Sequence, residues 1–188
     1  MDNIFVRVSN YVYKIKMYES YKRRKVQKDI ECDIMISDIE VQKLIEDVKP
    51  IPYQVINGIK PKVREDKKHL VWSYELQSKS WNTFVVKIRQ NTIYKFDFSV
   101  ILSYKDDGNN LHIIKRYNGI HTHTNKIEKN KIRGFHIHTI TERYQEKGYE
   151  PEGYAEVTEA YSDWRGALDT MIKECNFDIG NSNLDKFV

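Results

Sequence analysis

Hydrophobic and polar positions alternate through much of the middle of the chain, a spacing typical of antiparallel strands with one buried face. The segments that follow this pattern are residues 69–77, 81–90, 93–105 and 111–117. Asn91-Thr92 and the run DDGNN at 106–110 lie between the later segments, and both are turn sequences. The pattern therefore predicts a series of hairpins in one sheet.

Two other stretches have apolar residues at the three- and four-residue intervals of a helix. The first carries Val41, Leu44, Ile45 and Val48. Ser37 with Glu40 forms a capping box at its start, and Pro50 ends it. The second stretch is expected to begin at Ser162 as its N-cap. Its apolar face consists of Trp164, Ala167, Leu168, Met171, Ile172 and Cys175.

These elements predict an α+β fold. We expect an antiparallel sheet of about four to six strands, with a helix from the N-terminal half and a C-terminal helix packed on one face. The expected organisation is a basic N-terminal extension at 1–36, one α+β domain at 37–177 and a disordered tail at 178–188.

Charge is distributed unevenly along the chain, whose net charge is +4. Residues 142–188 hold eleven acidic and five basic residues, which leaves sixteen acidic and twenty-six basic residues in 1–141. Such asymmetry suits contact with a polyanion, although a solvated basic face has the same composition. We predict nucleic-acid binding by the basic run Lys22, Arg23, Arg24 and Lys25.

Other features exclude several classes of protein. The apolar runs are only a few residues long, far short of the roughly 20 that a membrane helix needs, and the N-terminus does not resemble a secretory signal. The two cysteines, Cys32 and Cys175, are too far apart in sequence for a CxxC zinc or redox motif. We expect a cytoplasmic protein with reduced thiols and no membrane partner.

The strongest chemical signal lies in RYNGIHTHTNKIEKNKIRGFHIHTITERY, residues 116–144. It contains two His-x-His doublets, and residues two apart in a strand share a face. If the two segments are neighbours, the four imidazoles converge beside arginine. The predicted catalytic residues are His121, His123, His136, His138, Arg116 and Arg143. Tyr117 and Arg133 are added to the predicted nucleic-acid-binding residues.

Three interpretations fit the doublets. Imidazoles can act as acid and base on an RNA phosphodiester while arginine stabilises the charge that develops. Alternatively, three histidines and a water can hold a catalytic metal. The third interpretation is structural, with neutral rings bonded to backbone or to neighbouring threonines. We favour metal-independent acid–base chemistry, and so we expect no metal and no other cofactor.

The run LHIIKRYNGIHTHTN, with GFHIHT downstream, resembles an uncharacterised family of small bacterial proteins that end in a Trp-containing helix. More distantly, it is similar to TumE-type toxins of toxin–antitoxin systems, which carry an Arg-aromatic-Asp/Asn element and two histidine-rich clusters. Arg116, Tyr117 and Asn118 match that element, and the two His-x-His doublets match the clusters. The resemblance implies a toxin-like ribonuclease held by an antitoxin.

The leading functional hypothesis is therefore a nucleic-acid-directed protein, a toxin-like metal-independent endoribonuclease that uses its histidine cluster. Its expected partners are RNA or another nucleic acid, and a protein that is either an antitoxin or a target of inhibition. The alternative is a non-enzymatic inhibitor or binding protein from a mobile element or defence locus, comparable to anti-CRISPR proteins.

Overall fold

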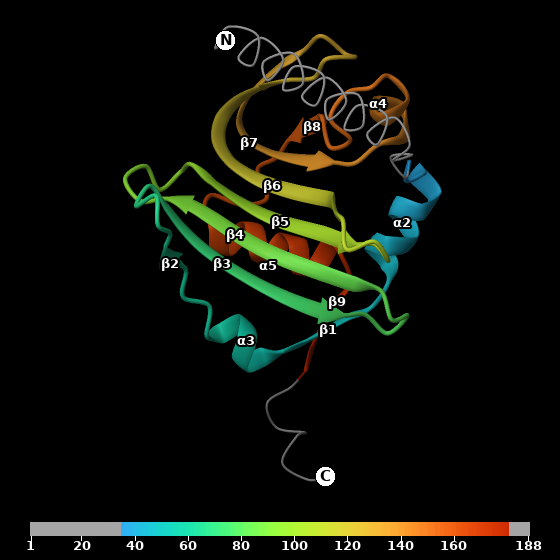
Figure 1. The fold of residues 1–188 in the computed structure, drawn as a ribbon. Coiled ribbons are helices and arrows are strands. Elements are labelled where there is room, and N and C mark those ends of the chain that lie inside the picture. Colours follow the sequence, from blue (N-terminus) through green and yellow to red (C-terminus); the bar gives the residue numbers. More distant parts are fainter. Residues whose placement is uncertain (1–34, 181–188) are drawn as a thin grey trace, which may run out of the picture. The chain divides into compact units, whose positions relative to one another are not determined.

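The computed structural model describes residues 35–180 of the chain, which divides into two units between Met35 and Ile36. The basic run from Lys22 to Lys25 lies outside the described residues. The elements of the second unit (Figure 1) are, in chain order, α2 (Asp38–Glu46), β1 (Lys49–Pro52), α3 (Tyr53–Asn57), β2 (Lys62–Val63), β3 (His69–Gln77), β4 (Thr83–Asn91), β5 (Phe98–Lys105), β6 (Leu111–Thr124), β7 (Lys131–Thr139), α4 (Glu142–Glu146), β8 (Tyr154–Val157), α5 (Trp164–Glu174) and β9 (Phe177–Gly180).

Within residues 35–180, seven strands form one antiparallel sheet in the order β2-β3-β4-β5-β6-β7-β8. The expected α+β fold is confirmed, with one strand more than the upper end of the expected range. A separate parallel pair joins β1 to β9 and places Lys49 opposite Phe177. Residues 178–180 were expected to belong to a disordered tail, but they are part of β9, whose backbone pairs with β1.

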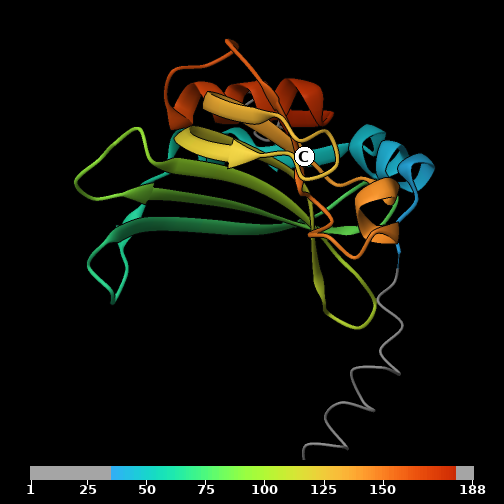
Figure 2. The ribbon, with the colours of Figure 1, turned by 90° about the horizontal axis from the view of Figure 1, so that it is seen from above.

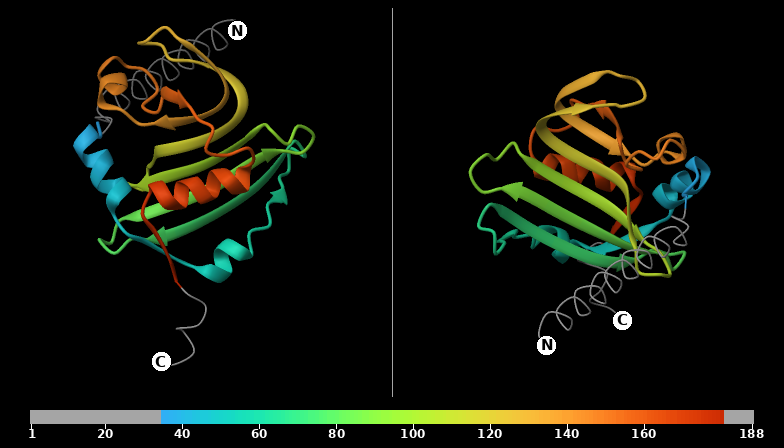
Figure 3. Two further views of the ribbon diagram at one scale, coloured as in Figure 1. Left: turned by 180° about the vertical axis from the view of Figure 1, so that it is seen from behind. Right: turned by 45° about the horizontal axis from the view of Figure 1, so that its top comes forward.

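One face of the large sheet is covered by α5, which crosses β5 and β6 (Figures 2 and 3). Alternate residues of β5, namely Phe98, Val100 and Leu102, are buried in the core that α5 completes with Leu168 and Met171. The N-cap of α5 is Asp163, one residue later than expected, because its carboxylate accepts the Gly166 N–H over 2.8 Å. The described helices leave the opposite face of β4 to β6 uncovered (Figure 1).

The predicted cap of α2 is confirmed, since the Ser37 hydroxyl accepts the backbone N–H of Glu40. The end of the helix is held by Lys49, which is fully buried. Its ammonium group donates to the carbonyl oxygens of Leu44 and Ile45, which belong to the last turn, over 2.7 and 3.1 Å. A buried cation at a helix C-terminus satisfies carbonyls that the helix itself leaves unpaired.

The connection between β4 and β5 is longer than the two-residue turn that the sequence predicted. The Asn91 side chain accepts the backbone N–H groups of Ile93 and Tyr94, and Asp97 donates its N–H to the Tyr94 carbonyl. This turn delays the start of β5 to Phe98. As a result, Tyr94 lies on an exposed loop and not in a half-buried strand.

Strand β6 is irregular at Gly119, where the pairing with β7 shifts between Asn118 and His121. Asn118 faces His136, yet His121, three residues later, faces Gly134, two residues earlier on β7. Since a one-residue shift moves following side chains to the other face, His121 and His123 share a face with Asn118. A Cβ on Gly119 would lie 1.8 Å from the Phe96 carbonyl oxygen, so only glycine fits here.

No helix within the described residues combines the length and apolar character needed to cross a membrane.

Candidate functional site

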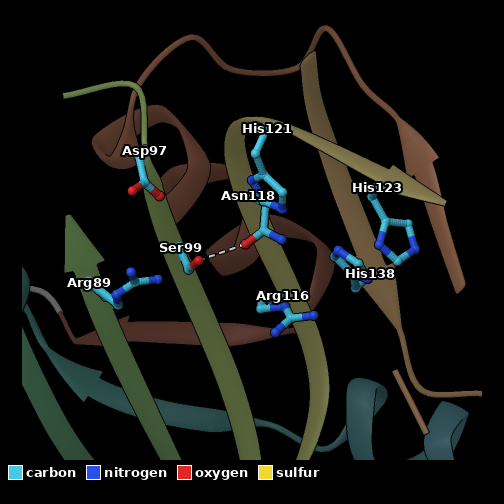
Figure 4. A pocket seen from close by; sticks show the side chains of 8 residues that line it. All are labelled: Arg89, Asp97, Ser99, Arg116, Asn118, His121, His123 and His138. Atoms are coloured by element: carbon cyan, nitrogen blue, oxygen red, sulfur yellow. Dashed lines mark hydrogen bonds between the residues drawn. The ribbon is translucent and has the colours of Figure 1, made fainter. Parts of the chain in front are cut away.

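The uncovered face of the sheet holds a pocket whose lining is entirely polar or charged. Figure 4 shows the lining residues, which are Arg89, Asp97, Ser99, Arg116, Asn118, His121, His123 and His138. They lie on β4, β5, β6 and β7 and on the turn just before β5. Four of the residues on this face form one row across the strands, because Arg89 pairs with Ser99, Ser99 with Asn118 and Asn118 with His136. The pocket is therefore positioned by the sheet itself.

All four histidines of the two doublets meet on this face. The ring centroids are 4.5 Å apart for His121 and His136, and 4.5 Å apart for His123 and His138. His136 and His138 are 4.9 Å apart and almost fully buried, whereas His121 is exposed. The convergence that the sequence suggested is present, and the irregularity at Gly119 brings the first doublet to this face.

Backbone carbonyls fix the orientation and tautomer of three of these rings. Nδ1–H of His136 donates to the Gly134 oxygen and Nδ1–H of His138 to the Glu152 oxygen, both over 2.8 Å. Each of these two neutral rings therefore keeps its lone pair on Nε2. His123 is reversed, since its Nε2–H donates to the Gly153 oxygen over 2.8 Å and leaves the lone pair on Nδ1.

Burial favours the neutral form of the inner rings. It lowers the pKa of His136 to about 4 and that of His138 to about 3, and the nearby Arg116 guanidinium acts in the same direction. Burial also lowers the pKa of His121. The sequence suggested that two of the imidazoles act as acid and base, without indicating which two. Near pH 7, however, His136 and His138 are neutral, and neither can supply a proton.

Two guanidinium groups contribute positive charge to the pocket. The Nε of Arg116 is buried and has no hydrogen-bond partner among the described residues, and its Nη1 lies 3.7 Å from a carboxylate oxygen of Glu152. Nη2 of Arg89 lies 2.6 Å from Nε2 of His69, whose Nδ1 contacts Asp66 over 2.9 Å. One planar guanidinium group can donate two parallel hydrogen bonds to the oxygens of a phosphate. This part of the pocket therefore suits an anion.

Four of the described residues predicted for the site are not among those that line the pocket. One of them, His136, is buried next to the lining ring of His121. Tyr117 is completely buried on the α5 side, where its hydroxyl donates to Glu174 over 2.8 Å, so it offers no surface for a base to stack on. Arg143 is paired with Glu128 over 2.5 Å and packs on the Tyr154 ring. Arg133 is exposed on β7. Tyr117 is thus wrong as a nucleic-acid contact, and Arg143 has its partners elsewhere.

The pocket also contains residues that the sequence did not single out. Arg89, Asp97 and Ser99 come from segments in which charged or hydroxyl residues alternate with apolar ones. Polar residues at facing positions of neighbouring strands were the available signal. Asn118 appeared only through the resemblance, and it accepts a hydrogen bond from the Ser99 hydroxyl over 2.7 Å in a buried position (Figure 4).

The arrangement could also hold a metal ion. One nitrogen from each of His121, His136 and His138 lies within 4.8 Å of the others. Imidazole nitrogens are the commonest protein ligands for transition metals. The pocket thus brings together groups for anion binding, for proton transfer and for metal coordination.

No family model, no curated protein and no solved structure matches this chain. The resemblance to TumE-type toxins therefore rests on the Arg-Tyr-Asn element and the histidine doublets alone, and it stays a prediction.

Proposed function

We propose that this protein is a cytoplasmic, toxin-like endoribonuclease whose active site is the polar pocket on the uncovered face of the sheet. The observation that carries the proposal is the meeting of Arg89 and Arg116 with three histidines in one pocket, with His136 packed against them. Cleavage of an RNA phosphodiester needs groups that bind the phosphate and a group that takes a proton from the attacking 2′-hydroxyl. The pocket has candidates for both.

The arginines supply the phosphate-binding part. The buried Nε of Arg116 has no hydrogen-bond partner within residues 35–180, and an anion would gain more from a guanidinium there than it would in water. Asn118 lies two residues from Arg116 on β6 and carries a further amide donor, Nδ2. As negative charge grows on the phosphorane oxygens, these fixed donors stabilise the transition state more than the ground state.

His123 is the proposed base. Its Nε2–H is bound to the Gly153 oxygen, so Nδ1 is the nitrogen that can accept a proton. The 2′-oxygen gives its proton to this nitrogen and attacks phosphorus, and the bond from phosphorus to the 5′-oxygen breaks. Solvent water protonates the departing 5′-oxygen, and the hydroxide that remains takes the proton from His123, which restores the base. The products are a 2′,3′-cyclic phosphate and a 5′-hydroxyl end.

The test is cleavage of labelled single-stranded RNA by the purified full chain, with identification of the product ends. Arg116→Gln removes a pocket charge and should lower the cleavage rate by about 10²-fold or more, the usual scale for a lost transition-state donor. Arg165→Gln is the matched control, because Arg165 is exposed on α5 and packs on Trp164. Its rate should equal that of the wild type.

Equal rates for the wild type and Arg116→Gln would overturn the assignment of the pocket. RNA that binds without being cut, under any metal condition, would instead favour the non-enzymatic binding protein. Both purified variants should first be checked by thermal melting, so that a loss of rate is not confused with a loss of fold.

A further inference from the structure

We propose that His121, His136 and His138 form a binding site for one divalent transition-metal ion of the zinc class. The three ligand nitrogens already lie within 4.8 Å of one another. Zinc binds imidazole nitrogens at about 2.0–2.1 Å, which places neighbouring ligands of a tetrahedral site about 3.4 Å apart. His121 is exposed on β6, so its ring has room to turn the remaining distance toward the two buried rings.

The two inner rings are already oriented as metal ligands. In metal sites, a ligating histidine usually donates its other N–H to a carbonyl or carboxylate, which fixes the tautomer and aims the free nitrogen. His136 and His138 do this through Gly134 and Glu152, respectively. A structural histidine would use both of its nitrogens, yet Nε2 of buried His138 has no hydrogen-bond partner among residues 35–180.

On His136, the other inner ring, metal binding would displace only one long contact. Nδ2 of Asn118 lies 3.4 Å from Nε2 of His136, a distance at the outer limit of a hydrogen bond. A metal ion bound at Nε2 replaces that contact with a much stronger one. The Asn118 amide stays fixed by the Ser99 hydroxyl, so the rest of the row is not disturbed.

The chemistry of the ligands selects the class of metal. Three imidazoles without a thiolate suit zinc, cobalt, nickel or copper, whereas magnesium and calcium need oxygen ligands. Three protein ligands also leave a fourth tetrahedral position for water, which is the arrangement of catalytic zinc sites. Asp97 and Glu152 lie near the two arginines on this face and partly balance their charge. The Arg89 and Arg116 guanidinium groups would still draw an anion toward the metal.

This site would modify the chemistry of the proposed ribonuclease, although metal binding itself does not depend on that function. His123 is not one of the three ligands, so it stays free for proton transfer. The metal-independent reaction expected from the sequence would then be replaced by one in which a cation beside the arginines helps to neutralise the phosphate.

The experiment is a titration of metal-free, chelator-treated full chain with Co²⁺, followed by visible absorption, and then with Zn²⁺ by calorimetry. The wild type should bind one equivalent and develop the intense visible bands of tetrahedral cobalt. His121→Ala changes an exposed side chain and should weaken binding by at least about 10-fold, because loss of a group that merely hydrogen-bonds to a metal ligand already costs about that much. His112→Ala is the matched control, since His112 lies outside the cluster and is paired with Asp106.

A wild-type chain that binds no Co²⁺ or Zn²⁺ overturns the proposal, and so does equal weakening in His121→Ala and His112→Ala. His138→Gln gives an independent check, because it removes an inner ligand while its amide can still donate to Glu152, and it should abolish the cobalt bands. RNA cleavage in excess chelator by a chain that binds no Co²⁺ or Zn²⁺ would leave the ribonuclease proposal standing while the metal proposal fails. Metal binding without any RNA cleavage would support the metal site and contradict the ribonuclease proposal.

Discussion

Nδ1 of His138 donates its hydrogen to the backbone carbonyl oxygen of Glu152 over 2.8 Å, from a position with only 1% of the residue exposed. This contact joins β7 to the segment before β8, and it decides which nitrogen of the ring faces the pocket. A backbone acceptor cannot be read from side-chain spacing. The segment before β8 thus orients His138 and His123 through the carbonyls of Glu152 and Gly153, and the Glu152 carboxylate lies near Arg116.

The buried imidazoles predict a fall in stability at mildly acidic pH. In the unfolded chain each ring takes a proton near pH 6.5, whereas folding lowers the pKa of His136 to about 4 and that of His138 to about 3. Between these values the unfolded state binds more protons, so stability decreases as the pH falls. Each ring contributes a slope of about 1.4 kcal/mol per pH unit.

This effect is measured by urea unfolding between pH 5.5 and 4.5 in the presence of chelator. Comparison with His138→Gln cancels the carboxylates that both chains share. The wild type should lose about 1.4 kcal/mol more per pH unit than the variant. Parallel pH dependences would mean that His138 is protonated in the folded protein.

Gly119→Ala should lower the stability of the fold, because the added Cβ would lie 1.8 Å from the Phe96 carbonyl oxygen. Overpacking of this kind costs about 1–3 kcal/mol in the free energy of unfolding. Relief of the clash would also disturb the turn before β5 and the position of His121. Gly180→Ala is the control, since nothing lies within 4 Å of the added carbon. Similar unfolding midpoints for the two variants would contradict the close approach.

Tyr117→Phe separates a structural role from a nucleic-acid-binding role. The change removes the hydrogen bond to Glu174 and should lower the free energy of unfolding by about 1 kcal/mol. RNA affinity, measured by fluorescence anisotropy, should not change, because the ring is fully buried on the α5 side. Weaker RNA binding at unchanged stability would restore Tyr117 as a contact residue.

The sequence predicted the elements best where one simple periodicity governs them. The stripe of α2 and the alternation of Phe98, Val100 and Leu102 follow directly from burial of one face. The parallel pair of β1 and β9 was missed because it joins short segments that are far apart in the chain. The later start of β5 was missed because the side chain of Asn91 replaces strand pairing with a local turn.

The sequence predicted about half of the residues that line the pocket, namely Arg116, His121, His123 and His138. The two doublets identified the four imidazoles, but their common face depends on the irregular pairing at Gly119, which period-two spacing does not reveal. Arg89 was missed because a single charged residue in a strand usually marks a solvated face. Its role is visible only from the row that it forms with Ser99 and Asn118 across three strands.

The most direct measurement is the initial rate of cleavage of labelled single-stranded RNA by wild-type protein, His123→Ala and His112→Ala, each assayed with zinc and with chelator. Loss of a general base lowers a rate by about 10²–10⁴-fold. We expect that loss for His123→Ala and a wild-type rate for His112→Ala, whose side chain contacts Asp106 away from the pocket. Equal rates for His123→Ala and the wild type, or no cleavage by the wild type in either condition, would contradict the proposed ribonuclease.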